Sequence, residues 1–345
     1  MDKVRWAILG TGGIARKLAN AIRHSRHGEL VAVASRTQAS ADAFGEEFGI
    51  PRRYEGYARA LDDADVEAVY ISLPNHLHAE WTVRCANAKK HVLCEKPFTV
   101  NTAEAEHALD AVRRARVLFM EAFQYRCHPT MQRICELIRE KAIGELKLIH
   151  ASFQYNLGPK YDNIRLSNPA AGGGIMDVGC YTISFARLVA GVAVGRTCTE
   201  PIELKGCAHI GTVSRVDEQA TAALKFPEGI VAYLACGTQV HFDATVRLFG
   251  SDGSLEVANL WVPPTEGNTI RLQRGGKTEE IRVETNSDPY TIEADLFAQC
   301  LREGRLEAPT PAMTHADTLG NMQALDRWRA EVGLVFDVER TPLDD

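Results

Sequence analysis

The chain has 345 residues, of which 45% are hydrophobic and 24% are charged, and its formal net charge is -6 at pH 7. This length exceeds one ordinary hydrophobic core and predicts two domains. Because the balance is mildly acidic and no long block of one charge sign occurs, nucleic acid and anionic membranes are disfavoured as partners.

The amino-terminal sequence and the pattern of cysteines indicate in which cellular compartment the protein is expected. Nothing in the first residues resembles a signal peptide and no apolar run looks long enough to span a bilayer, so a cytoplasmic protein is expected. The nine cysteines are an odd number. Since Cys94, Cys180 and Cys236 lie within apolar runs and no C-x-x-C pair occurs, we predict buried thiols, with neither a disulfide framework nor a metal site of the zinc type.

The first third of the chain alternates strand-like and helix-like segments. The candidate strands are residues 4–9, 30–35, 68–73, 91–94 and 117–123. Amphipathic stretches such as residues 102–115 separate them. This alternation predicts an α/β domain, placed at residues 1–123, in which helices cover both faces of a parallel sheet.

After residue 123 the pattern changes. A helix is expected at residues 129–143, and the β-rich runs after it are residues 147–155, 218–226, 229–240, 245–250 and 269–274. These predict an α+β domain, residues 124–345, with a mainly antiparallel sheet. Two amphipathic stretches beginning near Pro289 and Thr314 are expected to be helices, and packing of these helices back on the first domain is left open.

The first expected strand runs into GTGGIA, which fits G-x-G-x-x-A. Gly10 would permit a tight turn, Gly12 would let the backbone approach a pyrophosphate, and Ala15 would let the next helix pack closely. Gly13 and Ile14 would begin that helix, with its first N–H groups facing the phosphates. A second strand ends about twenty residues later, which is the spacing of a dinucleotide-binding fingerprint. A simple glycine turn is the alternative.

The second expected strand ends in ASRT, without the carboxylate that commonly binds a ribose 2′-hydroxyl. Ser35 and Arg36 stand there instead, and a hydroxyl with a guanidinium suits a 2′-phosphate. NADP is therefore the expected cofactor, and NAD remains possible. In the alternative, Arg36 stacks on the adenine or faces water.

The segments that follow the expected strands should line one edge, because ligands bind beyond the carboxyl ends of an open parallel sheet. The further residues expected to hold the cofactor there are Leu73, Pro74, Asn75, His78, Glu95 and Lys96. Lys96 would face the crevice for the nicotinamide. A surface lysine in a turn is the alternative.

A second motif, GGGIMDVGCY, ends in two candidate functional residues. Asp177 and Tyr181 are four residues apart and would share one face of a helix. Phe185 and Leu188 continue the same stripe, so an ordinary core helix is the alternative. Because an aspartate at the start of an apolar face is costly to bury unpaired, we expect the stripe to open into a polar site.

Four segments, AILGTGGIA, ISLPNHLHAEWTVRCANAKKHVLCEKPF, EAFQYRCHP and GGGIMDVGCY, together resemble the glucose-fructose oxidoreductase / inositol dehydrogenase (Gfo/Idh/MocA) family over essentially the whole chain. The resemblance implies a Rossmann domain, then a domain with a large open, mainly antiparallel sheet that often serves as the oligomer interface. It also implies sugar or cyclic polyol substrates and a homodimer or homotetramer. Tyr181, where many relatives have histidine, resembles the branch of glucose-fructose oxidoreductase and dimeric dihydrodiol dehydrogenase.

The resemblance and the residue types together imply a mechanism. Lys96 matches the family's E-K-P lysine, which contacts the reacting oxygen beside the nicotinamide. Tyr181 is the expected base, or the acid in reduction, and Lys96 would stabilise alkoxide charge and lower the tyrosine's pKa. Glu95 is expected to orient Lys96, and Asp177 to hold a neighbouring substrate hydroxyl.

The predicted function is an NADP-dependent oxidoreductase that transfers hydride between the nicotinamide and a hydroxyl or carbonyl carbon of a sugar or cyclic diol. The alternatives are a glycosidase that oxidises its sugar transiently and a non-catalytic nucleotide sensor. The sensor would not need Lys96, Asp177 and Tyr181 together. Arg126 and Arg165 are weaker candidates for substrate contacts, and salt bridges are the alternative for both.

Overall fold

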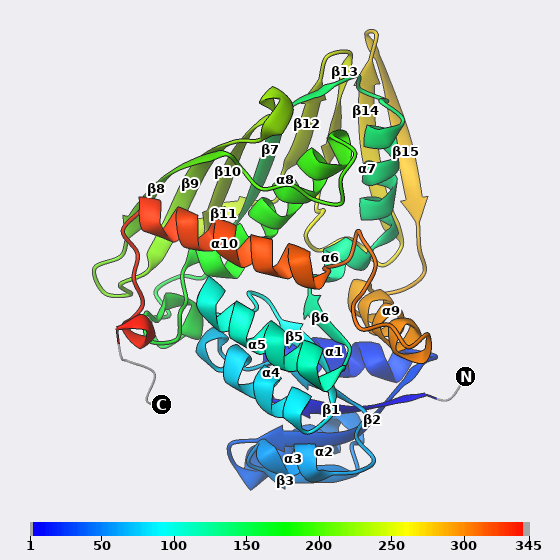
Figure 1. Cartoon of the computed structure of the whole chain (residues 1–345), viewed down its shortest axis with the longest axis vertical. Coiled ribbons are helices and arrows are strands. Elements are labelled where there is room, and N and C mark those ends of the chain that lie inside the picture. The colour runs from blue at the N-terminus through cyan, green and yellow to red at the C-terminus, as the bar shows by residue number, and fades with distance from the viewer. Residues whose placement is uncertain (1–2, 341–345) are drawn as a thin grey trace. The chain divides into compact units, whose positions relative to one another are not determined.

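The computed structural model describes residues 3–340 of the chain. These residues form two compact units, and the chain passes between the units several times. The first unit contains residues 3–99, 103–127 and 287–318, and the second contains residues 100–102, 128–286 and 319–340. Figure 1 traces the chain through both units from blue to red.

The first unit is built on a six-stranded parallel sheet with the order β3-β2-β1-β4-β5-β6. Its strands are β1 (Val4–Leu9), β2 (Gly28–Ser35), β3 (Arg52–Glu55), β4 (Ala68–Ile71), β5 (His91–Glu95) and β6 (Phe119–Ala122). The inner strands are almost wholly buried, as apolar runs between two layers of helices should be. The sheet confirms the predicted parallel α/β domain.

Helices cover this sheet. Those that lie wholly or mainly in the first unit are α1 (Gly13–His24), α2 (Gln38–Phe48), α3 (Ala58–Asp62), η1 (Asn75–Leu77), α4 (His78–Asn87), α5 (Thr102–Ala115), α6 (Gln124–Cys127) and α9 (Pro289–Arg302). Although α9 comes late in the chain, it packs against α1, as Figure 1 shows for the orange and dark blue helices. The rings of Trp6 and Phe297 lie 4.8 Å apart, so a distant segment completes the first core.

The second unit is built on a sheet of nine strands within the described residues, ordered β15-β14-β13-β12-β7-β10-β9-β8, with β11 paired to β7. Its strands are β7 (Leu146–Asn156), β8 (Glu203–Ile210), β9 (Asp217–Lys225), β10 (Val231–Gly237), β11 (Gln239–Asp243), β12 (Val246–Gly250), β13 (Gly253–Val257), β14 (Gly267–Arg274) and β15 (Lys277–Glu284). Only the pair β7–β10 is parallel among the pairings of these strands. This confirms the predicted large, mainly antiparallel sheet.

Helices lie against one face of the nine-stranded sheet. The helical segments of the second unit are α7 (Pro129–Arg139), η2 (Ile164–Leu166), η3 (Ile175–Gly179), α8 (Cys180–Ala193), η4 (Pro227–Gly229), most of α10 (His315–Glu331) and η5 (Asp337–Glu339). Figure 1 shows α7 and α8 in front of the strands that they contact. Residues along β9 and β10 alternate between buried and exposed, so the opposite face of these strands is open.

One segment corrects an expectation about apolar runs. Residues Ile175–Ala193 form 19 consecutive helical residues with a mean hydropathy of 1.4, which is long and apolar enough to cross a membrane. The expectation that no run reaches this length was wrong. The segment lies in the interior of its own unit, where it is the core helix packed against β7 and β10.

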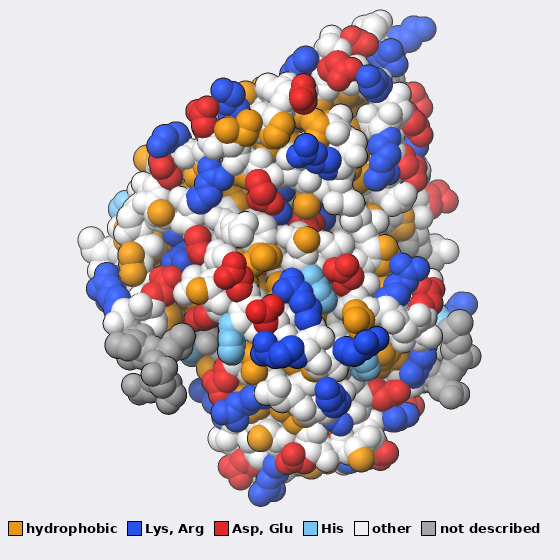
Figure 2. Space-filling view, viewed as in Figure 1, with side chains coloured by type: hydrophobic (Ala, Val, Ile, Leu, Met, Phe, Trp, Pro, Cys, Tyr) orange, Lys and Arg blue, Asp and Glu red, His pale blue; other side chains and the backbone are white. Residues whose placement is uncertain are grey.

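Charges and cysteines are distributed as the composition predicts. Figure 2 shows acidic and basic side chains interspersed over the face in view, without a large patch of one sign. Cys94, Cys180 and Cys236 are buried free thiols, which confirms their predicted burial. Cys207 is the exposed member of the set.

Candidate functional site

The glycine turn after β1 has the geometry that a pyrophosphate site requires. Gly10 has a φ of +101°, and a Cβ there would lie 2.9 Å from the Ser72 Oγ, so only glycine fits. Gly12 caps α1 and Gly13 begins it, and a Cβ on either would meet nothing within 4 Å. Ala15 is buried against the sheet. The space beside Gly12 and Gly13 at the start of α1 is therefore open, which fits an anionic group.

The end of β2 presents two hydroxyls and a guanidinium. Ser35 is buried at the strand end, and its Oγ lies 3.4 Å from the Oγ1 of Thr11, a residue that the sequence analysis did not single out. Arg36 follows as an exposed residue, and its charge acts on Tyr57, whose pKa burial raises and Arg36 lowers to a lesser extent. These groups would hold the ribose end of a dinucleotide.

The turn that carries Lys96 starts from a buried carboxylate. Glu95 ends β5, accepts a hydrogen bond from the Tyr70 hydroxyl through Oε1, and accepts the Lys96 backbone N–H through Oε2 at 3.3 Å. Burial, and then the Glu95 charge, raise the pKa of Tyr70, which keeps its hydroxyl a donor. Glu95 thus fixes the backbone of Lys96. Its predicted effect on the Lys96 side chain stays a prediction.

The loop after β4 lies next to the glycine turn, because a Cβ at Gly10 would also come within 3.4 Å of Leu73. Pro74 and Asn75 lead from Leu73 into η1. His78 begins α4, is completely buried, and directs its two ring nitrogens at two backbone carbonyls. This burial favours an indirect role for His78 over the cofactor contact that the sequence analysis predicts.

A second buried carboxylate, missed by the sequence analysis, holds the other side of the same turn. Glu121 of β6 accepts the backbone N–H of Phe98 through Oε1 at 2.9 Å. Burial raises the pKa of Glu121 to about 8. Only the fold could show this contact, because Glu121 lies inside an apolar strand with no pattern of its own.

In the second unit, the motif GGGIMDVGCY forms the start of the core helix. The structure differs from the expected single α-helix, because Ile175–Gly179 is a π-helical turn that precedes α8. Asp217 of β9 accepts the backbone N–H of Ile175 through Oδ2 at 2.6 Å. A Cβ at Gly173, where φ is +106°, would collide with Asp217 Oδ1, which explains this glycine. π-Helical turns often occur at functional sites.

Asp177 lies within a polar cluster. Its carboxylate, 13% exposed, accepts the Tyr155 hydroxyl at 2.5 Å and Nε of Arg165 at 3.1 Å through the same Oδ2 atom. Burial, followed by the Asp177 charge, raises the pKa of Tyr155. The ion pair of Arg165 with Asp177 favours the salt-bridge alternative for Arg165, and a substrate contact of Arg165 stays a prediction. Tyr155, whose place on β7 gave no signal, joins the same carboxylate. These partners compensate the burial of the Asp177 carboxylate within the protein, and a polar substrate site at Asp177 stays a prediction.

Tyr181 lies on α8, one turn after Asp177. It is 6% exposed, and its ring packs edge-on against Phe153 and Trp261, with centroid distances of 5.2 and 6.1 Å. These aromatic neighbours hold the ring of Tyr181 in place.

Arg126 is placed differently from the other candidates. Its guanidinium is fully buried, forms an ion pair with Asp317 and donates to the backbone carbonyl of Pro311. Burial, the largest influence, would lower the pKa of Arg126, but Asp317 and Tyr125 together outweigh it, so the pKa is raised and the group stays charged. These contacts favour the salt-bridge alternative, and a substrate contact of Arg126 stays a prediction.

The candidate residues thus form two clusters, and each cluster lies within one unit. Lys96, Glu95 and the glycine turn belong to the first unit, and Asp177 and Tyr181 belong to the second. That both clusters act on one substrate stays a prediction. Within residues 3–340, no group of three or more His, Cys, Asp or Glu side chains is arranged to hold a metal ion.

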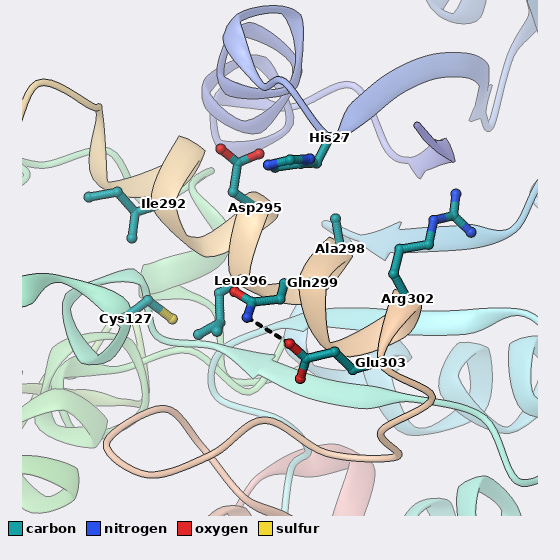
Figure 3. Close-up of a pocket in the computed structure, with 9 residues that line it drawn as sticks. All are labelled: His27, Cys127, Ile292, Asp295, Leu296, Ala298, Gln299, Arg302 and Glu303. Atoms are coloured by element: carbon teal, nitrogen blue, oxygen red, sulfur yellow. Dashed lines mark hydrogen bonds between the residues drawn. The ribbon is translucent and has the colours of Figure 1, made fainter. Parts of the chain in front are cut away.

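A separate pocket of about 490 Å³ follows the flank of α9 (Figure 3). Its lining residues are His27, Cys127, Ile292, Asp295, Leu296, Ala298, Gln299, Arg302 and Glu303. Polar groups here already have protein partners: Asp295 accepts from Ser25, Gln299 donates to Glu303, and Arg302 pairs with Glu67. We therefore assign this pocket no role in the reaction.

Comparison with known proteins identifies the class of this chain. A family model described as an oxidoreductase family with an NAD-binding Rossmann fold matches residues 4–123, and the Gfo/Idh/MocA C-terminal domain matches residues 131–256. A D-xylose 1-dehydrogenase (NADP(+)) of Haloferax volcanii is 33% identical over 323 residues, covering 93% of this chain and 95% of that protein. The mouse trans-1,2-dihydrobenzene-1,2-diol dehydrogenase is 28% identical and covers 96% of this chain and 98% of its own.

Among solved structures, a 3-ketoreductase from Actinomadura kijaniata in complex with NADP and TDP-benzene aligns with a TM-score of 0.85 at 28% identity. The alignment covers 96% of this chain and 98% of that one. The resemblance inferred from the sequence motifs is thereby confirmed. This chain belongs to the Gfo/Idh/MocA family, whose members are NAD(P)-dependent dehydrogenases and reductases that act on CH–OH groups.

Proposed function

We propose that this enzyme is an NADP-dependent oxidoreductase of a sugar or a cyclic diol. The observation that carries this proposal is the Tyr155–Asp177–Arg165 cluster, one helical turn before Tyr181. Hydroxyl, carboxylate and guanidinium groups in one place suit a substrate with several hydroxyls. The named substrates of the relatives, D-xylose and a dihydrodiol, are of this kind.

NADP is proposed over NAD because of the groups at the end of β2. The Thr11 and Ser35 hydroxyls and the Arg36 guanidinium offer donors to a 2′-phosphate, and the strand end ASRT has no carboxylate that would repel this phosphate. The open space before Gly12 and Gly13 would accept the pyrophosphate. When bound, the nicotinamide supplies the hydride acceptor or donor.

In the proposed mechanism, the substrate carbon loses a hydride and becomes a carbonyl, and the hydroxyl proton passes to Tyr181, which acts as the phenolate in this direction. In reduction, Tyr181 returns this proton to the alkoxide oxygen. The Lys96 ammonium stabilises negative charge on the same oxygen. Asp177 accepts a hydrogen bond from a neighbouring substrate hydroxyl and so orients the reacting carbon.

The proposal is tested by absorbance at 340 nm with sugars, their keto derivatives and cyclic diols, each with NADP(H) and NAD(H). With at least one compound of these classes, we expect one molecule of cofactor to be reduced or oxidised for each molecule of substrate converted. Hydrolysis of a glycoside without net change of the cofactor would instead identify the glycosidase alternative. Binding of NADP with no turnover of any compound would favour the nucleotide sensor.

The cofactor choice yields a first prediction. Arg36→Ala should lower kcat/KM with NADP by about 10- to 150-fold, because a charge-assisted contact contributes roughly 1.5 to 3 kcal/mol. It should leave kcat/KM with NAD nearly unchanged. The measurement is kcat/KM with both cofactors. Arg23→Ala, an exposed arginine at the opposite end of α1, is the control. A wild type that prefers NAD would contradict the assignment.

The partner expected from the family resemblance is a second copy of this chain, and we propose that copies associate through the open face of the sheet. Val231 and Tyr233 are 43% and 44% exposed on β10, and the His150 ring of β7 stacks on Tyr233 at 4.3 Å. Exposed aliphatic and aromatic side chains in the middle of a sheet are typical of interfaces.

Tyr233→Glu should therefore convert the dimer or tetramer into smaller species, because a charge would be buried at the contact. Light scattering after gel filtration measures the mass. Val213→Glu places the same charge on an exposed apolar residue outside the strands and should leave the mass unchanged. A monomeric wild type would refute this association.

A further inference from the structure

The turn that carries Lys96 is held by buried side chains from several elements of the first unit. Tyr70 of β4 donates to Glu95, which precedes Lys96. Glu121 of β6 accepts the N–H of Phe98, two residues after it. The backbone is therefore fixed on both sides of a residue whose own side chain is only partly buried.

His78 adds a contact of a different kind, because it joins this turn to a second loop. Its Nδ1 lies 2.9 Å from the carbonyl oxygen of Pro97, and its Nε2 lies 2.7 Å from the carbonyl oxygen of Leu73. Leu73 in turn packs against the glycine turn at Gly10. The imidazole is thus the link between the loop beside the pyrophosphate turn and the turn of Lys96.

We propose that His78 is a positioning residue that couples the cofactor loop at Leu73 to the catalytic turn at Lys96, and that Glu121 holds the far side of that turn. This inference rests on the proposed catalytic role of Lys96. His78 and Glu121 act through the backbone, since both side chains are buried and bonded to main-chain groups.

The contacts of His78 with the Pro97 carbonyl and with the Leu73 carbonyl can be removed one at a time by substitution. Carbonyl oxygens only accept, so each link requires a proton on the facing ring nitrogen, and a neutral imidazole carries one such proton. Burial lowers the pKa of His78 to about 4 although both carbonyls act to raise it, so at neutral pH the ring is neutral. It therefore donates a hydrogen bond to one of the two carbonyls at a time, and whether Nδ1 or Nε2 carries the proton decides which loop is held. Asparagine places a donor near the position of Nδ1, and glutamine places one near that of Nε2.

The experiment compares His78→Asn and His78→Gln in the full chain. His78→Gln keeps the donor toward Leu73 and loses the link to Pro97, so kcat should fall by about tenfold or more while NADPH affinity stays within about threefold. His78→Asn keeps the link to Pro97, so NADPH should bind about tenfold more weakly while kcat is largely kept. NADPH affinity is measured by equilibrium fluorescence.

A third measurement needs neither substrate nor cofactor. The rate at which acetic anhydride acetylates the Lys96 amine, followed by mass spectrometry, should change by about threefold or more in His78→Gln and stay near wild type in His78→Asn. Thr82→Val, a buried substitution one turn further along α4, is the control for disturbing this helix and should change nothing.

Glu121 supplies the second pair of variants in case a His78 variant does not fold. Glu121→Met removes the acceptor of the Phe98 N–H and should resemble His78→Gln, whereas Glu121→Gln retains an acceptor and should restore turnover. Equal losses in both His78 variants, or unchanged behaviour in all of these variants, would overturn the proposal. If wild type turns over no substrate, the proposed function has failed, and acetylation and NADPH affinity still decide this inference.

Discussion

Tyr181→Phe should lower kcat by about 10²- to 10⁴-fold while the affinity for NADP and the melting temperature stay close to wild type. The substitution removes the hydroxyl that is proposed to exchange the proton. It keeps the ring that packs edge-on against Phe153 and Trp261, so the core of the second unit should not change. Steady-state kinetics with a substrate from the screen, NADP binding and thermal unfolding are the measurements.

Tyr233→Phe, which removes a hydroxyl from an exposed ring of the sheet, is the matched control and should retain full turnover. A loss below tenfold in Tyr181→Phe would mean that water or another residue carries the proton. A large loss of NADP affinity would mean that Tyr181 contributes to binding.

Lys96→Met should lower kcat by about 10²-fold or more, because it removes the cation proposed to stabilise the alkoxide. The pH–rate profile should also move, since loss of the positive charge raises the apparent pKa of the group that accepts the proton. Lys96→Arg keeps the charge and should keep the profile near its original position. Lys89→Met, on an exposed lysine before β5, is the control for loss of charge.

Turnover near wild type in Lys96→Met, with an unchanged pH profile, would contradict the mechanism. Lys96 would then be the surface lysine of a structural turn, and the buried contacts of Glu95 and Glu121 would serve stability alone.

The elements with a strong apolar pattern could be predicted from the sequence. Strand β1 and helix α5 have the bounds expected from their residue patterns. The glycine turn could be predicted from the sequence because the positive φ at Gly10 requires glycine. In contrast, β3 and β15 were missed, since RRYE and KTEEIRVE are edge strands made mostly of polar residues.

The supports of the candidate residues were not predictable, because they depend on long-range contacts. Tyr155 meets Asp177 only when β7 lies beside the core helix, and Glu121 meets Phe98 only when β5 and β6 pair. Spacing along the chain carries no signal for such contacts. The π-helical turn at Ile175–Gly179 likewise depends on Asp217, which comes from a strand 42 residues later.

The late position of α9 in the chain has a consequence for biosynthesis. Phe297 belongs to the same apolar cluster as Trp6, so a ribosome must synthesise the whole nine-stranded sheet before the first core can close. Until then the nascent Rossmann segment exposes the apolar surface that α9 will cover, and domains still incomplete during synthesis are prone to aggregate. A fragment that stops after β6 would keep that surface exposed permanently, and we expect it to depend on chaperones in a way that the full chain does not.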